Sequence, residues 1–145
     1  MAEHRNPKLT VDGIIVIEGK IVLVRRRNPP FQGELALPGG FVEYGETVEE
    51  AVAREVEEET GLAAAVERLL GVYSDPGRDP RGHTVSVVFV MGKQRGSVRA
   101  GSDAAGVEMV DLDSLPKLAF DHSRIVEDYV RSETSMRSNH GKRLN

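Results

Sequence analysis

The sequence contains no cysteine among its 145 residues. Disulfide scaffolds, zinc ribbons, thiol nucleophiles and iron–sulfur ligation are therefore all excluded. A chain of this length buries enough surface on folding to be stable without such cross-links. A reducing, cytoplasmic setting is the one we expect.

Long apolar runs and an excess of basic residues are also missing. The longest apolar runs, Ile14–Ile17 and Val87–Met91, are far shorter than the roughly 18 residues that span a bilayer. Residues 1–10 carry no apolar signal-peptide core. Lys and Arg number 19 against 23 Asp and Glu, so the chain has no basic surplus for binding nucleic acid. We therefore expect neither a membrane nor a nucleic acid among its partners.

The composition that remains is that of an ordinary globular domain, with 39% hydrophobic and 29% charged residues. We predict a single domain over residues 1–145, with its ordered core at about 8–131. Residues 132–145 are polar and aperiodic, and they are predicted to fray.

Short β-branched runs alternate with two helical segments. A hairpin within Leu9–Arg25 is predicted to turn at Glu18-Gly19. Further strands are predicted at Glu34–Leu37, Ala64–Tyr73, Thr84–Met91 and Val107–Val110, with helices over Thr47–Thr60 and from Asp121 onward and a helical turn near 111–116. This order favours an α/β fold of the α+β kind, an α/β/α sandwich with a mixed sheet between helices.

The segment Thr47–Thr60 is the clearest helix, because Thr47 and Glu50 match a capping box and Gly61 stands where a left-handed cap belongs. At about 100° per residue, Glu55 and Glu59 continue the apolar stripe that Val48 and Val52 begin. Anions near the carboxyl end of a helix cost about 0.3–1 kcal/mol each, and burying them unpaired costs more. A divalent cation relieves these penalties, since Mg²⁺ takes carboxylate oxygens, waters and substrate phosphate.

The simpler alternative is a solvated acidic face with Arg54 as its counter-ion, paired with Glu50 and Glu58 four residues away on either side. A solvated face should not, however, be collinear with the apolar stripe. The geometry therefore favours a metal-carboxylate site.

The same stretch resembles the signature of the Nudix hydrolases, G-x5-E-x7-R-E-U-x-E-E-x-G-U, where U is aliphatic. Every position matches: Gly40, Glu46, Arg54, Glu55, Val56, Glu58, Glu59, Gly61 and Leu62. Seven fixed identities make a chance match negligible, on the order of 10⁻⁸ per window. The resemblance also covers most of Leu9–Arg131.

The resemblance implies a mixed sheet between helices and a metal-dependent hydrolase, with Mg²⁺ or Mn²⁺ as cofactor, that splits a nucleoside diphosphate linked to X. It implies Glu55, Glu59 and the backbone carbonyl of Gly39 as metal ligands, with Glu58 as a further ligand or as the base that activates water. Arg54 and Glu46 would orient the glutamates. A further ligand or base is left open between Asp103 and Glu108. A homodimer is favoured as well.

Within the family, the segments Ser74–Ser86, Arg25–Pro30 and Leu118–His122 resemble those of short archaeal and bacterial ADP-ribose pyrophosphatases. In these segments cationic or donor groups could bind phosphate and Asp79 could accept from a ribose diol, so the side chains that we expect to contact the substrate are Arg25, Arg27, Asp79, Arg81 and His83. In the alternative interpretation the Asp-Pro pairs of Ser74–Ser86 simply build a rigid turn. Only four Phe and three Tyr occur, so a stacked base has few candidate partners: Phe31, Phe41, Tyr44 and Phe120.

The function we expect is hydrolysis of ADP-ribose to AMP and ribose 5-phosphate. A MutT-like nucleoside-triphosphate pyrophosphatase is the alternative within the same fold. A sensor that binds ADP-ribose without turnover is the alternative of another class.

Overall fold

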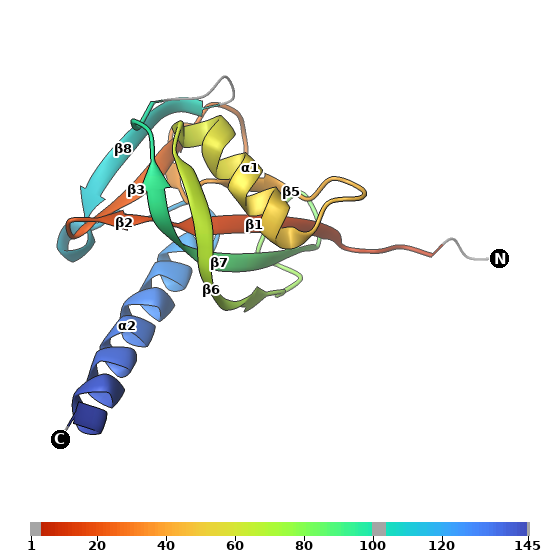
Figure 1. Ribbon diagram of the computed structural model, residues 1–145. Coiled ribbons are helices and arrows are strands. Elements are labelled where there is room, and N and C mark those ends of the chain that lie inside the picture. Colours follow the sequence, from red (N-terminus) through yellow and green to blue (C-terminus); the bar gives the residue numbers. More distant parts are fainter. Residues whose placement is uncertain (1–3, 100–103, 145) are drawn as a thin grey trace.

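The computed structural model of the protein describes residues 4–99 and 104–144 (Figure 1). Its elements in chain order are β1 (Lys8–Ile14), β2 (Val16–Ile17), β3 (Lys20–Arg26), β4 (Leu35–Ala36), β5 (Gly39–Phe41), α1 (Val48–Thr60), β6 (Ala63–Tyr73), β7 (Thr84–Arg95), β8 (Ala104–Asp111), the 3-10 turn η1 (Leu112–Ser114) and α2 (His122–Leu144). The predicted hairpin, the capped helix and the later strands are all confirmed. The short strand β5 was not predicted.

The strands form two sheets rather than the single sheet expected. The first has the order β5-β1-β7-β6, and within it β1 and β7 run parallel while the other pairs are antiparallel. The second is centred on β3, which pairs antiparallel with β2, β4 and β8. The first sheet is therefore mixed, as predicted.

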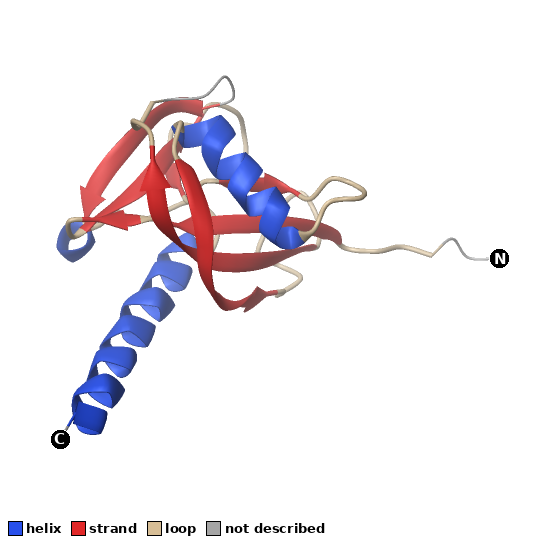
Figure 2. Cartoon of the chain, viewed as in Figure 1, coloured by secondary structure: helices blue, strands red, loops and turns tan. Residues whose placement is uncertain are grey.

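The two helices cover opposite faces of the sheets (Figure 2). Because side chains alternate along a strand, β1, β3 and β7 supply residues to two separate cores. One core joins Ile14, Leu23 and Val90 to Ile125 of α2. The other joins Val11, Val22 and Phe89 to Val52 and Val56 of α1. The α/β/α sandwich is thus confirmed.

The chain passes from the first sheet to the second between β1 and β2, and it then turns back at Glu18-Gly19. Both turn residues are left-handed, with φ of 51° and 77°, as a two-residue hairpin loop requires. This tight turn reverses the chain so that β3 pairs antiparallel with β2, and β3 also pairs with β8.

The expectation that the chain frays after residue 131 is wrong for the backbone, because α2 continues to Leu144 and projects from the body (Figure 1). Arg68 of β6 donates to Ser132 Oγ at 2.8 Å and to Glu133 Oε1 at 2.9 Å. These bonds tie the first polar turn to the sheet, and the following turns add backbone hydrogen bonds to a helix already begun. No helix within the described ranges is long and apolar enough to cross a membrane.

Candidate active site

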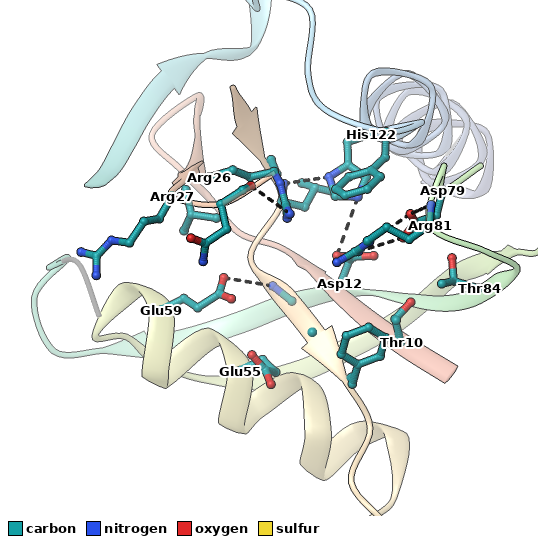
Figure 3. A pocket seen from close by; sticks show the side chains of 18 of the residues that line it. Thr10, Asp12, Arg26, Arg27, Glu55, Glu59, Asp79, Arg81, Thr84 and His122 are labelled. Carbon is teal, nitrogen blue, oxygen red and sulfur yellow. Dashed lines mark hydrogen bonds and ion pairs between the residues drawn. The ribbon is translucent and has the colours of Figure 1, made fainter. Parts of the chain in front are cut away.

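A cleft of about 460 Å³ opens between α1 and β5 on one side and the end of β3, the loop after β6 and the start of α2 on the other (Figure 3). Carboxylates from α1 and β1 share it with arginines from β3 and the loop. Its lining comprises Thr10, Asp12, Val24, Arg25, Arg26, Arg27, Asn28, Ala36, Leu37, Gly39, Gly40, Phe41, Glu43, Glu55, Glu59, Arg78, Asp79, Arg81, Thr84, Phe120 and His122. A cavity of this size and mixed charge suits a nucleotide-sized anion.

Two of the predicted metal ligands on α1, Glu55 and Glu59, line this cleft against β5. The Glu55 side chain is only 14% exposed, and burial raises its pKa, an effect that hydrogen bonding to Arg54 partly offsets. Glu59 Oε2 accepts a hydrogen bond of 3.3 Å from the Gly39 amide. A side chain at Gly40 would meet the Glu55 carboxyl at 2.6 Å. Gly40 therefore lets the strand approach the Glu55 carboxyl closely, since a side chain there would displace it.

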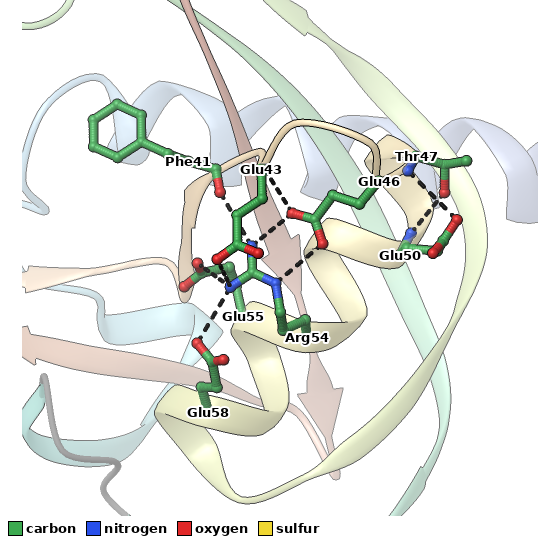
Figure 4. A network of polar contacts seen from close by, with 8 residues as sticks. All are labelled: Phe41, Glu43, Glu46, Thr47, Glu50, Arg54, Glu55 and Glu58. Carbon is green, nitrogen blue, oxygen red and sulfur yellow. Dashed lines mark hydrogen bonds and ion pairs between the residues drawn. The ribbon is translucent and has the colours of Figure 1, made fainter.

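The guanidinium of Arg54 forms hydrogen bonds with three acidic side chains of this region (Figure 4). It donates to both oxygens of Glu46, at 2.7 and 3.1 Å, and to Glu55 Oε1 at 2.8 Å. It also donates to Glu58 Oε2 at 3.3 Å and to the Phe41 carbonyl at 3.2 Å. These bonds lower the pKa of Glu46 and raise that of Arg54. Arg54 therefore contacts Glu46, Glu55 and Glu58, the glutamates that the resemblance pairs with it.

Glu50 does not pair with Arg54, contrary to the sequence-based alternative, because it closes the capping box. Its Oε1 accepts from the Thr47 amide at 3.4 Å, while Thr47 Oγ1 accepts from the Glu50 amide at 3.0 Å. The box fixes the first turn of α1, and Gly61, with φ of 80°, ends the helix. Both ends of the helix are thereby positioned by local sequence.

The donor set at the cleft fits a divalent cation. Glu58 is 57% exposed and bonded to Arg54, and it is not among the cleft-lining residues. Over the described residues, no three acidic or histidine side chains stand close enough to hold a metal by themselves. Mg²⁺ needs no such cage, because it is ordinarily bound by one or two carboxylates plus waters and substrate phosphate. Glu55 and Glu59 beside the Gly39 backbone supply such a pair.

The opposite wall is cationic. Arg25, Arg26 and Arg27 follow one another at the end of β3, and all three line the cleft. Arg26 donates to the Pro30 carbonyl at 2.7 Å and stacks 4.8 Å over the Phe120 ring; burial lowers its pKa. Arg25 donates to the Gly33 carbonyl at 2.6 Å and pairs with Glu108. Guanidinium groups held in this way suit phosphate oxygens.

The loop between β6 and β7 is fixed by two ion pairs. Asp79 is buried and accepts from the Arg81 amide at 2.9 Å and from its guanidinium at 2.8 and 3.1 Å. Burial opposes ionisation of Asp79, but the Arg81 hydrogen bonds outweigh it and lower the pKa. Arg78 donates hydrogen bonds to both carboxylate oxygens of Asp121, at 2.8 and 3.0 Å. The loop is therefore rigid, as one alternative held, and its Asp79 and Arg81 also line the cleft.

Two other predicted residues, His83 and Glu108, are not among the residues that line the main cleft. His83 is exposed, with Nε2 3.0 Å from the Ser74 carbonyl oxygen, and it lines an adjoining pocket with Arg5 and Lys8. Glu108 pairs with Arg25 and is not among the cleft-lining residues. Asp103 lies outside the described residues.

The aromatic candidates divide between cleft and surface. Phe120 and Phe41 line the cleft, while Phe31 packs 4.8 Å from the Phe120 ring centre. Tyr44 is fully exposed. Phe120 has a φ of 53°, a strained conformation for an aromatic residue, and it stands beside Arg26.

Sequence reasoning missed two buried polar residues at the cleft, Asp12 of β1 and His122 of α2. Burial raises the pKa of Asp12 to about 7, although its hydrogen bond from Ser86 opposes the shift. Burial lowers the pKa of His122 to about 4. An acid inside the apolar run Val11–Ile17 was the available signal for Asp12.

Fold and site together define an α/β/α domain that sets a pair of helix carboxylates opposite a wall of arginines, an arrangement suited to a phosphate-bearing ligand and a divalent cation. The chain belongs to the NUDIX domain family, whose model matches residues 7–129. This confirms the family that the residue pattern suggested.

Relatives within the family are similar over most of the chain. An ADP-ribose pyrophosphatase of Methanocaldococcus jannaschii is 59% identical over 88% of this chain and 76% of its own. The NUDIX domain of NrtR from Shewanella oneidensis, solved with ADP-ribose, superposes with a TM-score of 0.79 at 28% identity, covering 89% of this chain and 90% of that one. A bifunctional NMN adenylyltransferase/ADP-ribose pyrophosphatase of Francisella tularensis, solved with AMP and a manganese ion, gives a TM-score of 0.81 at 27% identity over 90% of this chain and 43% of that one.

Proposed function

We propose that the protein hydrolyses the pyrophosphate bond of ADP-ribose, giving AMP and ribose 5-phosphate, with Mg²⁺ or Mn²⁺ as cofactor. The observation that carries the proposal is the convergence of Glu55 and Glu59 with the arginine wall in one cleft. The 59% identity to an ADP-ribose pyrophosphatase supports the choice of substrate. The manganese ion named with the F. tularensis structure supports the choice of metal.

In this proposal Glu55, Glu59 and the Gly39 backbone hold the cation, and Glu58 serves as a further ligand or as the base. The cation, when bound, neutralises phosphate oxygens and lowers the pKa of water. Arg54 holds Glu55 and Glu58 in place through hydrogen bonds of 2.8 and 3.3 Å, and Glu46 fixes Arg54. A proton leaving the attacking water would pass to Glu58.

On the opposite wall, Arg27 and Arg81 are proposed to neutralise the diphosphate, whose charge grows on the leaving phosphate. Asp79 positions Arg81 through bonds to its guanidinium. Arg25 contributes positive charge while tied to Glu108. His83 would reach only the part of a ligand that enters the adjoining pocket. Asp103 and Glu108 remain proposals for an additional ligand or base.

The test is hydrolysis of ADP-ribose by the full chain with Mg²⁺, following AMP and ribose 5-phosphate by chromatography. We expect turnover that stops in EDTA and that exceeds the turnover of dGTP and other nucleoside triphosphates. Faster cleavage of triphosphates would instead establish the MutT-like activity. Tight binding of ADP-ribose that stays intact with Mg²⁺ and with Mn²⁺ would establish a sensor.

We also propose that the protein is a cytoplasmic homodimer. Strand β6 is an edge of the first sheet, and its Leu69 and Val72 are exposed, as are Val130 and Met136 of α2. Exposed apolar side chains on an unpaired edge strand suit a second copy of the chain. Light scattering on purified protein should give twice the monomer mass, and a monomer at micromolar concentration would refute the dimer.

A further inference from the structure

Asp12 and His122 face each other across the cleft wall without touching (Figure 3). His122 Nε2 and Asp12 Oδ1 are 3.9 Å apart, which is too long for a hydrogen bond. Both residues line the cleft, and His122 is only 5% exposed and Asp12 only 7% exposed. The gap between these two buried polar groups therefore has the size for one bridging oxygen atom.

One side-chain atom of each residue already has a hydrogen-bond partner. His122 Nδ1 accepts from the Leu37 amide at 3.0 Å, so in the neutral ring Nε2 carries the proton and is a donor. Asp12 Oδ2 accepts from Ser86 Oγ at 2.5 Å, which leaves Oδ1 as the acceptor turned toward His122. The gap therefore has a donor on one side and an acceptor on the other.

Asp12 and His122 are each positioned by contacts of the element that carries them. The His122 amide donates to the Ala119 carbonyl at 3.0 Å, and the neighbouring Asp121 is held by both nitrogens of the Arg78 fork. On the other side, Asp12 lies in β1 opposite Gly39 in the strand register, and a side chain at Gly39 would meet Asp12 Oδ1 at 2.4 Å. The two groups sit on separate, well-fixed elements.

The chemistry of the gap selects its ligand. Two hydrogen bonds of about 2.8 Å each can bridge a separation of this size through a single oxygen. That oxygen must accept from Nε2–H and donate to a carboxyl oxygen. A phosphate oxygen or carbonyl cannot donate, and an ammonium cannot accept. Water does both, and among the groups that ADP-ribose carries only a hydroxyl does both, so a ribose hydroxyl could take the place of a bridging water.

Resting on the proposed function, we propose that Asp12 and His122 recognise one ribose hydroxyl of ADP-ribose, with Nε2–H donating to it and Oδ1 accepting from it. The pair adjoins Gly39, so the hydroxyl lies next to the proposed diphosphate site. ADP-ribose carries a ribose on each side of its diphosphate, and either could supply the hydroxyl. The pair is specificity-determining, because a substrate that lacks this group leaves both buried atoms unpaired.

The test compares ADP-ribose with five analogues on the full chain, each lacking one ribose hydroxyl: the 2- or 3-hydroxyl of the adenosine ribose, or the 1-, 2- or 3-hydroxyl of the distal ribose. With the wild-type protein, we expect one analogue to have a kcat/KM at least about tenfold below that of ADP-ribose. The identity of this analogue tells which ribose the pair binds. The variants are Asp12→Asn, which removes the acceptor, and His122→Asn, whose amide oxygen can still accept from Leu37 while the cleft-facing donor is lost. Asp128→Asn, an Asp bonded to Tyr73 at 2.8 Å and absent from the cleft lining, is the matched control.

In both cleft variants we expect ADP-ribose and that analogue to be turned over with equal kcat/KM, whereas the control keeps the wild-type ratio. Equal rates for all analogues in wild type, or a ratio that survives both cleft substitutions, would overturn the proposal. If the chain binds ADP-ribose without cleaving it, the same ratios are read from Kd by calorimetry; the proposed function then fails while the hydroxyl contact is still judged. No binding of ADP-ribose at all would overturn both.

Discussion

Glu59 carries a negative charge at the carboxyl end of α1, where the helix dipole is already unfavourable to anions. We expect Glu59→Gln to lower turnover of ADP-ribose by roughly 100-fold or more, because a neutral amide is a poor ligand for Mg²⁺. Without metal the same change should stabilise the fold by about 0.3–1 kcal/mol, since the amide oxygen can still accept from Gly39. Steady-state kinetics and thermal melting in EDTA measure the two effects.

Glu57→Gln is the matched control for this prediction, because Glu57 is an exposed residue in the same turns of the helix. It should give a similar small gain in EDTA and leave turnover near that of wild type. A Glu59→Gln variant that melts below wild type in EDTA would show that charge repulsion is not what the metal relieves.

At the scale of single residues, local spacing predicted the position of Glu55 and Glu59 on the buried side of α1 and the contact between Arg54 and Glu58, since these groups lie within one helix. Asp12 and His122 could not be found in this way. Their partners, Ser86 and Leu37, stand 74 and 85 residues away in the chain. Such contacts depend on how strands are ordered in the sheets.

Among the elements, α1 depends on its amino-terminal cap. Thr47→Ala removes the hydroxyl that accepts from the Glu50 amide at 3.0 Å and should cost about 1 kcal/mol of unfolding free energy. Thr47→Ser keeps the hydroxyl and should cost much less. Denaturant unfolding monitored by circular dichroism measures both, and equal losses for the two variants would mean that the cap does not stabilise the helix.

The same scale shows what sequence patterns can and cannot predict. The capping box and Gly61 fixed the bounds of α1 because helix ends are local structures. Strand β5 was missed because it has only three residues, two of them glycine, and it forms by pairing with β1. The last turns of α2 were missed because their anchor, Arg68, comes from a distant strand.

At the scale of the whole molecule, the cleft lies where the two sheets meet. β1 brings Asp12, β3 brings the arginines, and α2 begins with His122. The layered fold could be predicted from the order of strand and helix segments along the chain. The division into two sheets could not be predicted, because it depends on a one-residue interruption between strands β1 and β2, from Ile14 to Val16.

Asp12 and His122 also give the molecule two opposed pH dependences. Burial raises the pKa of Asp12 from 3.8 to about 7, so its contribution to stability is full below 3.8 and is lost as pH rises toward 7. Burial lowers the pKa of His122 from 6.5 to about 4, so its contribution is full above 6.5 and is lost as pH falls toward 4. In the wild-type protein the two trends offset each other between these limits.

Single substitutions should separate the two trends in metal-free protein. The difference in melting temperature between Asp12→Asn and wild type should rise with pH from about 4 to about 7, because the variant no longer loses stability by burying an ionised carboxylate. The difference between His122→Asn and wild type should fall over the same range, since the variant lacks the imidazole that gains stability when it is neutral. Each trend corresponds to a few kcal/mol at most. Differential scanning calorimetry at several pH values measures both, and trends of the same sign would contradict the assignment of buried acid and buried neutral imidazole to this wall of the cleft.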